Sequence, residues 1–131
     1  MLDCNPLTTH MVPNLKLFVD LDSDLVDPSL YRKLIGSLVY LVNSRPDICF
    51  VVNTLSQFMV EPRWIHWKAA KHVLKFLKGT IQYGMRCVGD GELLLYGFVD
   101  SDWARGASTK RSTFGYCFSL GSCMISWFSG K

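Results

Sequence analysis

The spacing of apolar residues changes after Gly79, and this change divides the chain into two parts with different folds. From Pro28 to Lys78, apolar side chains recur every three or four residues, which is typical of amphipathic helices. After Gly79 they alternate along short runs, which indicates strands. We therefore predict an α+β fold, with a small three-helix bundle followed by a mainly antiparallel sheet of about four strands.

Local signals set the expected ends of the helices. Three helices are predicted, at about residues 28–42, 46–59 and 62–78. Asp27 is a favoured N-cap, and Pro28 suits the first helical position. Pro46 and Pro62 interrupt the pattern because the residue before a proline disfavours helical geometry. Gly79 is the expected helix stop.

The remaining residues are expected to form an arm and a sheet. Four strands are predicted, at residues 84–88, 92–100, 112–120 and 123–128. Gly-Asp-Gly at 89–91 is a hairpin signal, and Gly121-Ser122 is a second turn. Pro6, Pro13 and the lack of any sustained period predict an extended arm at the start. The predicted units are an arm or linker (1–27), a helical segment (28–80) and a sheet (81–131).

Cysteine usage and hydropathy favour an intracellular protein. The five cysteines are odd in number and include no Cys-x-x-Cys pair, so we expect reduced thiols. Their spacing relative to His66 and His72 fits no zinc pattern. No apolar leader with a cleavage site is present, and charges interrupt every apolar run. We therefore expect neither secretion nor a membrane-spanning segment.

The third predicted helix carries a basic face. Residues 31–88 contain nine Lys or Arg against two acids. Four of these cations fall within one third of the helix circumference: Lys68, Lys71, Lys75 and Lys78. Such a face can contact phosphates, each contact adding a salt-dependent term through counterion release. A solvated helix face explains the same pattern, and both interpretations stay open here.

The apolar run from Leu93 to Val99 ends on two acids, Asp100 and Asp102. Both faces of this run are apolar, so we expect a strand covered on both sides, with Asp100 emerging from the interior at its end. Paired Mg²⁺ ions that hydrolyse phosphodiesters need several carboxylates, and the sequence offers one or two. The alternative is that the acids mark the exit of the strand into a polar loop. A serine-hydrolase elbow and a Gly-rich phosphate loop are both missing from the sequence.

Several stretches, in this order and spacing, resemble the Pol polyproteins of copia-type LTR retrotransposons. The matching stretches are Tyr31–Leu41, Arg45–Ile48, Leu55–Met59, Ala69–Thr80, Asp100–Ala104, Lys110–Tyr116 and Ile125–Trp127. Their order and spacing match the family from about Pro28 to the last residue of the sequence. Cys4–Thr9 resembles the segment that follows the polymerase palm in that family. Arg105 and Gly130 depart from the family pattern.

The resemblance implies a function for each part. Residues 28–80 look like the thumb and connection of the reverse transcriptase, which holds the primer-template duplex. Residues 81–131 look like the opening of an RNase H fold, in which Asp100 matches the first metal-binding aspartate and Mg²⁺ is the cofactor of the parent enzyme. The polymerase palm would precede Met1, and the remaining RNase H acids would follow Lys131. We therefore expect a fragment without independent catalysis and without tightly bound Mg²⁺.

Two further hypotheses belong to other functional classes. The basic helix, residues 62–78, would serve alone as a nucleic-acid-binding module for an RNA–DNA hybrid or another duplex. Alternatively, the exposed sheet edge would recruit a partner chain. An RNase H sheet without its covering helices would also expose apolar surface, so self-association is expected alongside contact with the rest of Pol.

Overall fold

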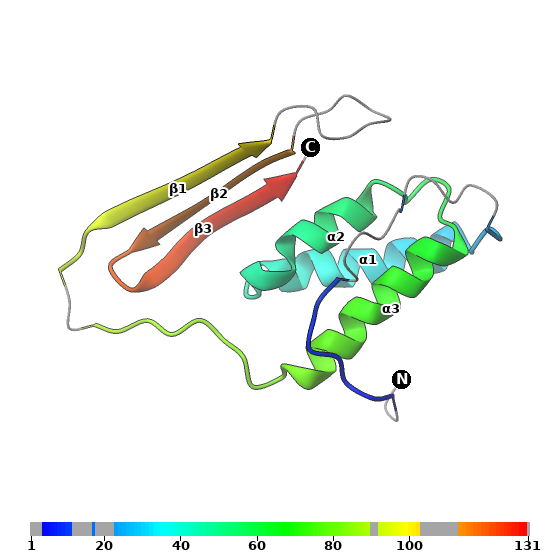
Figure 1. Ribbon diagram of the computed structural model, residues 1–131, viewed down its shortest axis with the longest axis horizontal. Coiled ribbons are helices and arrows are strands. Elements are labelled where there is room, and N and C mark those ends of the chain that lie inside the picture. Colours follow the sequence, from blue (N-terminus) through cyan, green and yellow to red (C-terminus); the bar gives the residue numbers. More distant parts are fainter. Residues whose placement is uncertain (1–3, 12–16, 18–22, 90–91, 103–112, 131) are drawn as a thin grey trace.

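The computed structural model describes residues 4–11, 17, 23–89, 92–102 and 113–130 (Figure 1). These residues form three α-helices, one 3-10 turn and one antiparallel sheet of three strands. In chain order, the helices come first and the strands last, which confirms the predicted α+β class. No helix in this part of the chain combines the length and apolar character needed to cross a bilayer.

The helices begin close to their predicted positions. The helical elements are α1 (Pro28–Val42), the 3-10 turn η1 (Pro46–Ile48), α2 (Cys49–Ser56) and α3 (Trp64–Gly79). Asp27 caps α1 as expected, because its Oδ1 accepts a hydrogen bond from the Ser29 amide at 2.8 Å. The second predicted helix is shorter than expected and starts as a 3-10 turn at Pro46.

A single hydrophobic core lies between the three helices. The largest side chains with almost no exposed surface are Tyr31, Ile35, Ile48, Leu55, Val51, Val52 and Val73. The Tyr31 hydroxyl is satisfied within this core, since it donates to the Leu55 carbonyl oxygen at 2.9 Å. Its burial raises the pKa of the phenol, so the ring stays neutral. The helical part therefore has an interior of its own.

The sheet has the strand order β1-β2-β3. Its members are β1 (Leu95–Asp102), β2 (Thr113–Leu120) and β3 (Cys123–Gly130). The turn between β2 and β3 lies where Gly121-Ser122 predicts it, and Gly121 adopts a left-handed φ of 57°. Strand β3 is nearest to α2, and β1 is the outermost strand (Figure 1). Side-chain hydrogen bonds join the sheet to the helices. Trp127 Nε1 donates to the Val42 carbonyl at 2.9 Å, and Asn53 donates to the Ser129 carbonyl.

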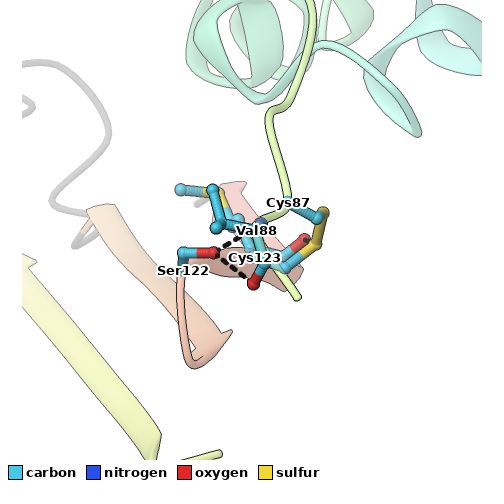
Figure 2. The surroundings of a disulfide bond; sticks show 5 residues. Cys87, Val88, Ser122 and Cys123 are labelled. Carbon is cyan, nitrogen blue, oxygen red and sulfur yellow. Dashed lines mark hydrogen bonds between the residues drawn. A yellow bond between two sulfur atoms is a disulfide. The ribbon is translucent and has the colours of Figure 1, made fainter. Parts of the chain in front are cut away.

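The prediction of a strand at residues 84–88 is wrong. These residues form no ladder with 92–100. Instead, Val88 lies beside the β2–β3 turn, where its amide donates to Ser122 Oγ at 2.8 Å (Figure 2). Next to it, Cys87 and Cys123 form a disulfide between residues that are 36 positions apart. The expectation of five reduced thiols is therefore also wrong, because the folded chain brings together two cysteines that no local motif links.

The expected burial of the strand before Asp100 is wrong as well. Phe98 and Val99 are 63% and 64% exposed, and every residue from Leu95 to Ser101 is exposed. Strand β1 pairs only with β2 among the described strands, so its other edge is unpaired there. An apolar run on both faces of a strand cannot by itself distinguish a covered strand from an uncovered one.

Candidate nucleic-acid interface

Helix α3 presents a buried side and a basic side. His66, Ala69, Ala70, Val73 and Phe76 form its buried side. On the other side, Lys68 is exposed, and Lys71 and Lys75 are half-exposed. These three lysines are called the basic face below. None of them makes a salt bridge to an acid in the described part of the chain, where the ion pairs are Arg45–Asp47 and Arg63–Glu61.

Two tryptophans position one lysine of the basic face. The Lys71 ammonium lies 5.0 Å from the ring centre of Trp67 and 5.5 Å from that of Trp64. Both distances are within the range of a cation–π interaction, worth about 0.5–1 kcal/mol at an exposed site. Aromatic rings therefore lie beside the basic face and hold one of its cations at the surface.

The fourth predicted lysine, Lys78, is engaged by the start of the chain. Residues 4–11, called the N-terminal segment below, run along the last turns of α3 (Figure 1). Lys78 Nζ donates to the Cys4 carbonyl at 2.8 Å, and the Leu7 amide donates to the Lys75 carbonyl at 3.2 Å. His72 Nε2 donates to the Thr9 carbonyl at 2.9 Å. The four-lysine face of the sequence therefore becomes a three-lysine face bordered by the N-terminal segment.

The N-terminal segment approaches α3 closely at Gly79, where the helix residue has no side chain. A Cβ added to Gly79 would lie 3.0 Å from Pro6 Cβ and 3.1 Å from the Leu7 carbonyl oxygen. The ring of His10 also meets Phe76 edge-on, with ring centres 5.7 Å apart. Within the predicted arm or linker, residues 4–11 thus pack against the end of α3.

His66 anchors the start of α3 from inside. Its Nδ1 accepts the Arg63 amide at 3.0 Å, so Nε2 carries the proton and donates to the Leu17 carbonyl at 3.0 Å. The ring stacks on Phe58 with ring centres 3.8 Å apart. Burial, which outweighs the hydrogen bond to Leu17, lowers the pKa of this imidazole. The buried, neutral ring has a structural role and is not part of the basic face.

Asp100, the predicted metal ligand, has no cluster of further ligands among the described residues. Asp100 is exposed on β1, opposite Gly115 of β2. The described residues include no group of three or more His, Cys, Asp or Glu that could hold a metal ion. One exposed carboxylate alone does not form a Mg²⁺ site, because Mg²⁺ needs several oxygen ligands at once.

Comparison with known proteins identifies the family. The sequence is 42% identical over all 131 residues to the retrovirus-related Pol polyprotein from transposon RE1 of Arabidopsis thaliana. The chain belongs to the copia-type retrotransposon Pol polyproteins. This confirms the resemblance carried by the sequence motifs. The chain spans only 9% of the RE1 polyprotein, so it corresponds to a small part of Pol.

Shorter proteins are also similar to this chain. An uncharacterized mitochondrial protein of Arabidopsis thaliana is 42% identical over 127 residues, which are 97% of this chain and 52% of that protein. The secreted RxLR effector protein 161 of Plasmopara viticola is 41% identical over 102 residues, covering 77% of this chain and 72% of the effector. No family model matches the sequence, and no solved structure matches it.

Proposed function

We propose that this Pol segment spans the junction between the reverse transcriptase thumb and connection and the RNase H domain, and that α3 contacts the backbone of the primer-template duplex. The observation that carries the proposal is the basic face, a set of three surface lysines without acidic partners among the described residues. In a polymerase polyprotein, such a surface suits the sugar-phosphate backbone, because ammonium groups neutralise phosphates without reading sequence.

The sheet contributes in a different way. We propose that Asp100 supplies one ligand of the RNase H metal site in the parent polyprotein, and that the isolated chain has no catalysis of its own. The ligand role is supported by the similarity to copia-type Pol polyproteins, whose pattern the stretch Asp100–Ala104 matches. The lack of catalysis in the isolated chain is proposed because Asp100 has no cluster of further ligands among the described residues. In the full polyprotein, the other acids would have to come from outside the described residues.

Salt-dependent binding of an RNA–DNA hybrid tests the role of the basic face. Fluorescence anisotropy of a labelled hybrid should show affinity that falls steeply with salt. The double variant Lys68→Gln with Lys75→Gln should reduce the slope of log affinity against log salt by about two, since each phosphate contact contributes about 0.9. Lys71 is left in place because its substitution would also remove the contacts with Trp64 and Trp67.

Arg32→Gln is the matched control for this experiment. Arg32 is an exposed cation on α1, outside the basic face. Its substitution should leave the slope unchanged. Equal slopes for the wild type and the double variant, or no binding at low salt, would exclude α3 as the contact surface.

Cleavage of the same hybrid tests the second part of the proposal. Purified chain with Mg²⁺ is expected to release no RNA fragments from the hybrid. Release of fragments that disappears in Asp100→Asn would show that the chain alone holds a working metal site and would overturn the proposal.

A further inference from the structure

A shallow apolar cavity lies between α1 and α3. Its volume is about 400 Å³. Leu34 from α1 and Trp67 and Leu74 from α3 contribute half-buried side chains that pack against the core of the bundle. The floor of the cavity is therefore held by the same contacts that hold the helices together, and it does not need a ligand to form.

The rim of this cavity is incompletely covered. Leu30 lines it and is 50% exposed, although it stands beside half-buried apolar neighbours. Covering such a side chain removes apolar surface from water, at roughly 25 cal/mol per Å². Binding of an apolar group is therefore favourable at this position.

Both helices place a cation at the cavity. Lys33 comes from α1 and Lys71 from α3. Neither makes a salt bridge to an acid in the part of the chain that the structure describes. Lys71 is held in place by the rings of Trp64 and Trp67, which limits the rotamer freedom that a bound anion would have to remove. The cavity thus combines an apolar floor with two positive charges on opposite sides.

We propose that this cavity is a docking site for an acidic peptide that inserts large apolar side chains between α1 and α3 and places carboxylates beside Lys33 and Lys71. The peptide fits better than a nucleic-acid backbone, because sugar and phosphate groups gain nothing from a floor of Leu34 and Leu74. The cavity shares Lys71 with the basic face, whereas Leu30 and Lys33 lie on α1, outside that face, so variants at these two residues test the peptide site separately from duplex binding by α3.

A designed probe tests the proposal with the whole chain. The probe is a fluorescein-labelled peptide, Glu-Glu-Leu-Ala-Glu-Leu-Leu-Glu-Glu, with blocked ends. Anisotropy titration should give saturable binding that weakens about tenfold in Leu30→Glu and about tenfold in Lys33→Glu. Arg32→Glu is the control, because Arg32 is an exposed neighbour on the same helix that does not line the cavity. It should bind the probe like the wild type.

Two altered peptides separate the apolar and charged contributions. Replacing the three leucines with alanine should abolish binding, and replacing the glutamates with lysine should do the same. Circular dichroism confirms that each protein variant is folded, which is expected since Leu30 and Lys33 are solvent-exposed.

Three outcomes would overturn the proposal. They are the absence of saturable binding, equal binding by the wild type and both cavity variants, and displacement of the probe by an RNA–DNA hybrid whose own affinity falls in the neutral variant Leu30→Ala. The last result would make the cavity a nucleic-acid surface. Loss of hybrid binding in the Lys68 and Lys75 double variant with retained probe binding would instead leave the peptide site intact.

Discussion

At the scale of single residues, Arg45 connects distant parts of the helical bundle. Its side chain donates to both carboxylate oxygens of Asp47, at 2.9 and 2.7 Å. It also donates to the Thr80 carbonyl at 3.1 Å and to Thr80 Oγ1 at 2.7 Å. The hydrogen bonds from Arg45 hold the pKa of the Asp47 carboxyl below its usual value. One guanidinium thus ties the loop after α1 to Thr80, the residue that caps the end of α3.

We expect Arg45→Ala to lower the free energy of unfolding by about 2 kcal/mol, because it leaves the buried Thr80 carbonyl without its donor. Urea denaturation followed by circular dichroism measures this change. Asp47→Asn is the comparison variant, and it should cost less, since Arg45 keeps both bonds to Thr80. A cost for Asp47→Asn as large as that for Arg45→Ala would contradict the central role of Thr80.

The buried imidazole of His66 should make stability depend on pH. Its pKa is lowered in the folded state, so the unfolded chain binds a proton first as the pH falls. The contribution of His66 is therefore fully present above the unfolded pKa of about 6.5 and is lost as the pH falls through the folded pKa. The slope from this group is at most about 1.4 kcal/mol per pH unit.

Titration of the His66 ring signals by NMR, together with urea denaturation at several pH values, checks this prediction. The ring should titrate below the value seen in the urea-unfolded chain. A folded-state titration at or above the unfolded value would show that burial does not govern this group.

Neither of these residue roles could be predicted from the sequence. The Arg45 and His66 side chains bond to carbonyl groups of Thr80 and Leu17, which are 35 and 49 positions away in the chain. Lys78 shows the same limit, because helical spacing predicts its place on α3 but not its bond to Cys4. Helical spacing therefore identifies which lysines lie on the same side of α3. It does not show that a carbonyl group from the start of the chain accepts a hydrogen bond from Lys78.

At the scale of elements, prediction succeeded where the signal is local. The start of α1 depends on Asp27 and Pro28, and the β2–β3 turn depends on Gly121, each of which acts within a few residues. The prediction of a strand at 84–88 is wrong because this segment contacts Ser122 and Cys123, which lie more than 30 positions later in the chain, and does not pair with the next strand. The turn residues at 89–91 carry no information about contacts with residues so far away in the chain.

The Cys87–Cys123 disulfide should stabilise the connection between bundle and sheet. Because it closes a loop between residues 36 positions apart, the chain-entropy model gives a contribution of about 3–4 kcal/mol to the unfolding free energy of the part it closes. Reduction, or Cys87→Ser, should lower stability and speed hydrogen exchange at the Val88 amide, which bonds to Ser122 beside the bridge.

Mass spectrometry after alkylation provides the decisive measurement. Alkylation of the oxidised, denatured protein should label three cysteines: Cys4, Cys49 and Cys117. Labelling of all five would show that the bridge is not formed. Cys117→Ser is the matched control and should leave exchange at Val88 unchanged.

At the scale of the whole molecule, the two edge strands of the sheet differ in their surroundings. Strand β3 is joined to the helices through Trp127 and Ser129, whereas β1 keeps an unpaired edge among the described strands. The exposed apolar residues of β1 include Leu95, Tyr96, Phe98 and Val99. A long apolar edge of this kind is a template for pairing with another chain.

We expect the purified chain to self-associate through β1. Sedimentation velocity should show species larger than the monomer, and their share should rise with protein concentration. Phe98→Lys should shift the distribution toward the monomer, because a charge on the edge strand opposes pairing. Tyr40→Lys, an equally drastic change at an exposed site on α1, is the control. A monomer at all concentrations, or an equal shift by both variants, would contradict association through β1.

The N-terminal segment also has a consequence for biosynthesis. Its contacts with His72 and Lys78 join residues 63 and 74 positions apart, so they can form only after α3 has left the ribosome. Until then, residues 4–11 emerge without the helix that holds them. Folding of the helical unit should therefore be completed only after the last turns of α3 have been synthesised, and residues 4–11 should pack after the helices that follow them in the chain.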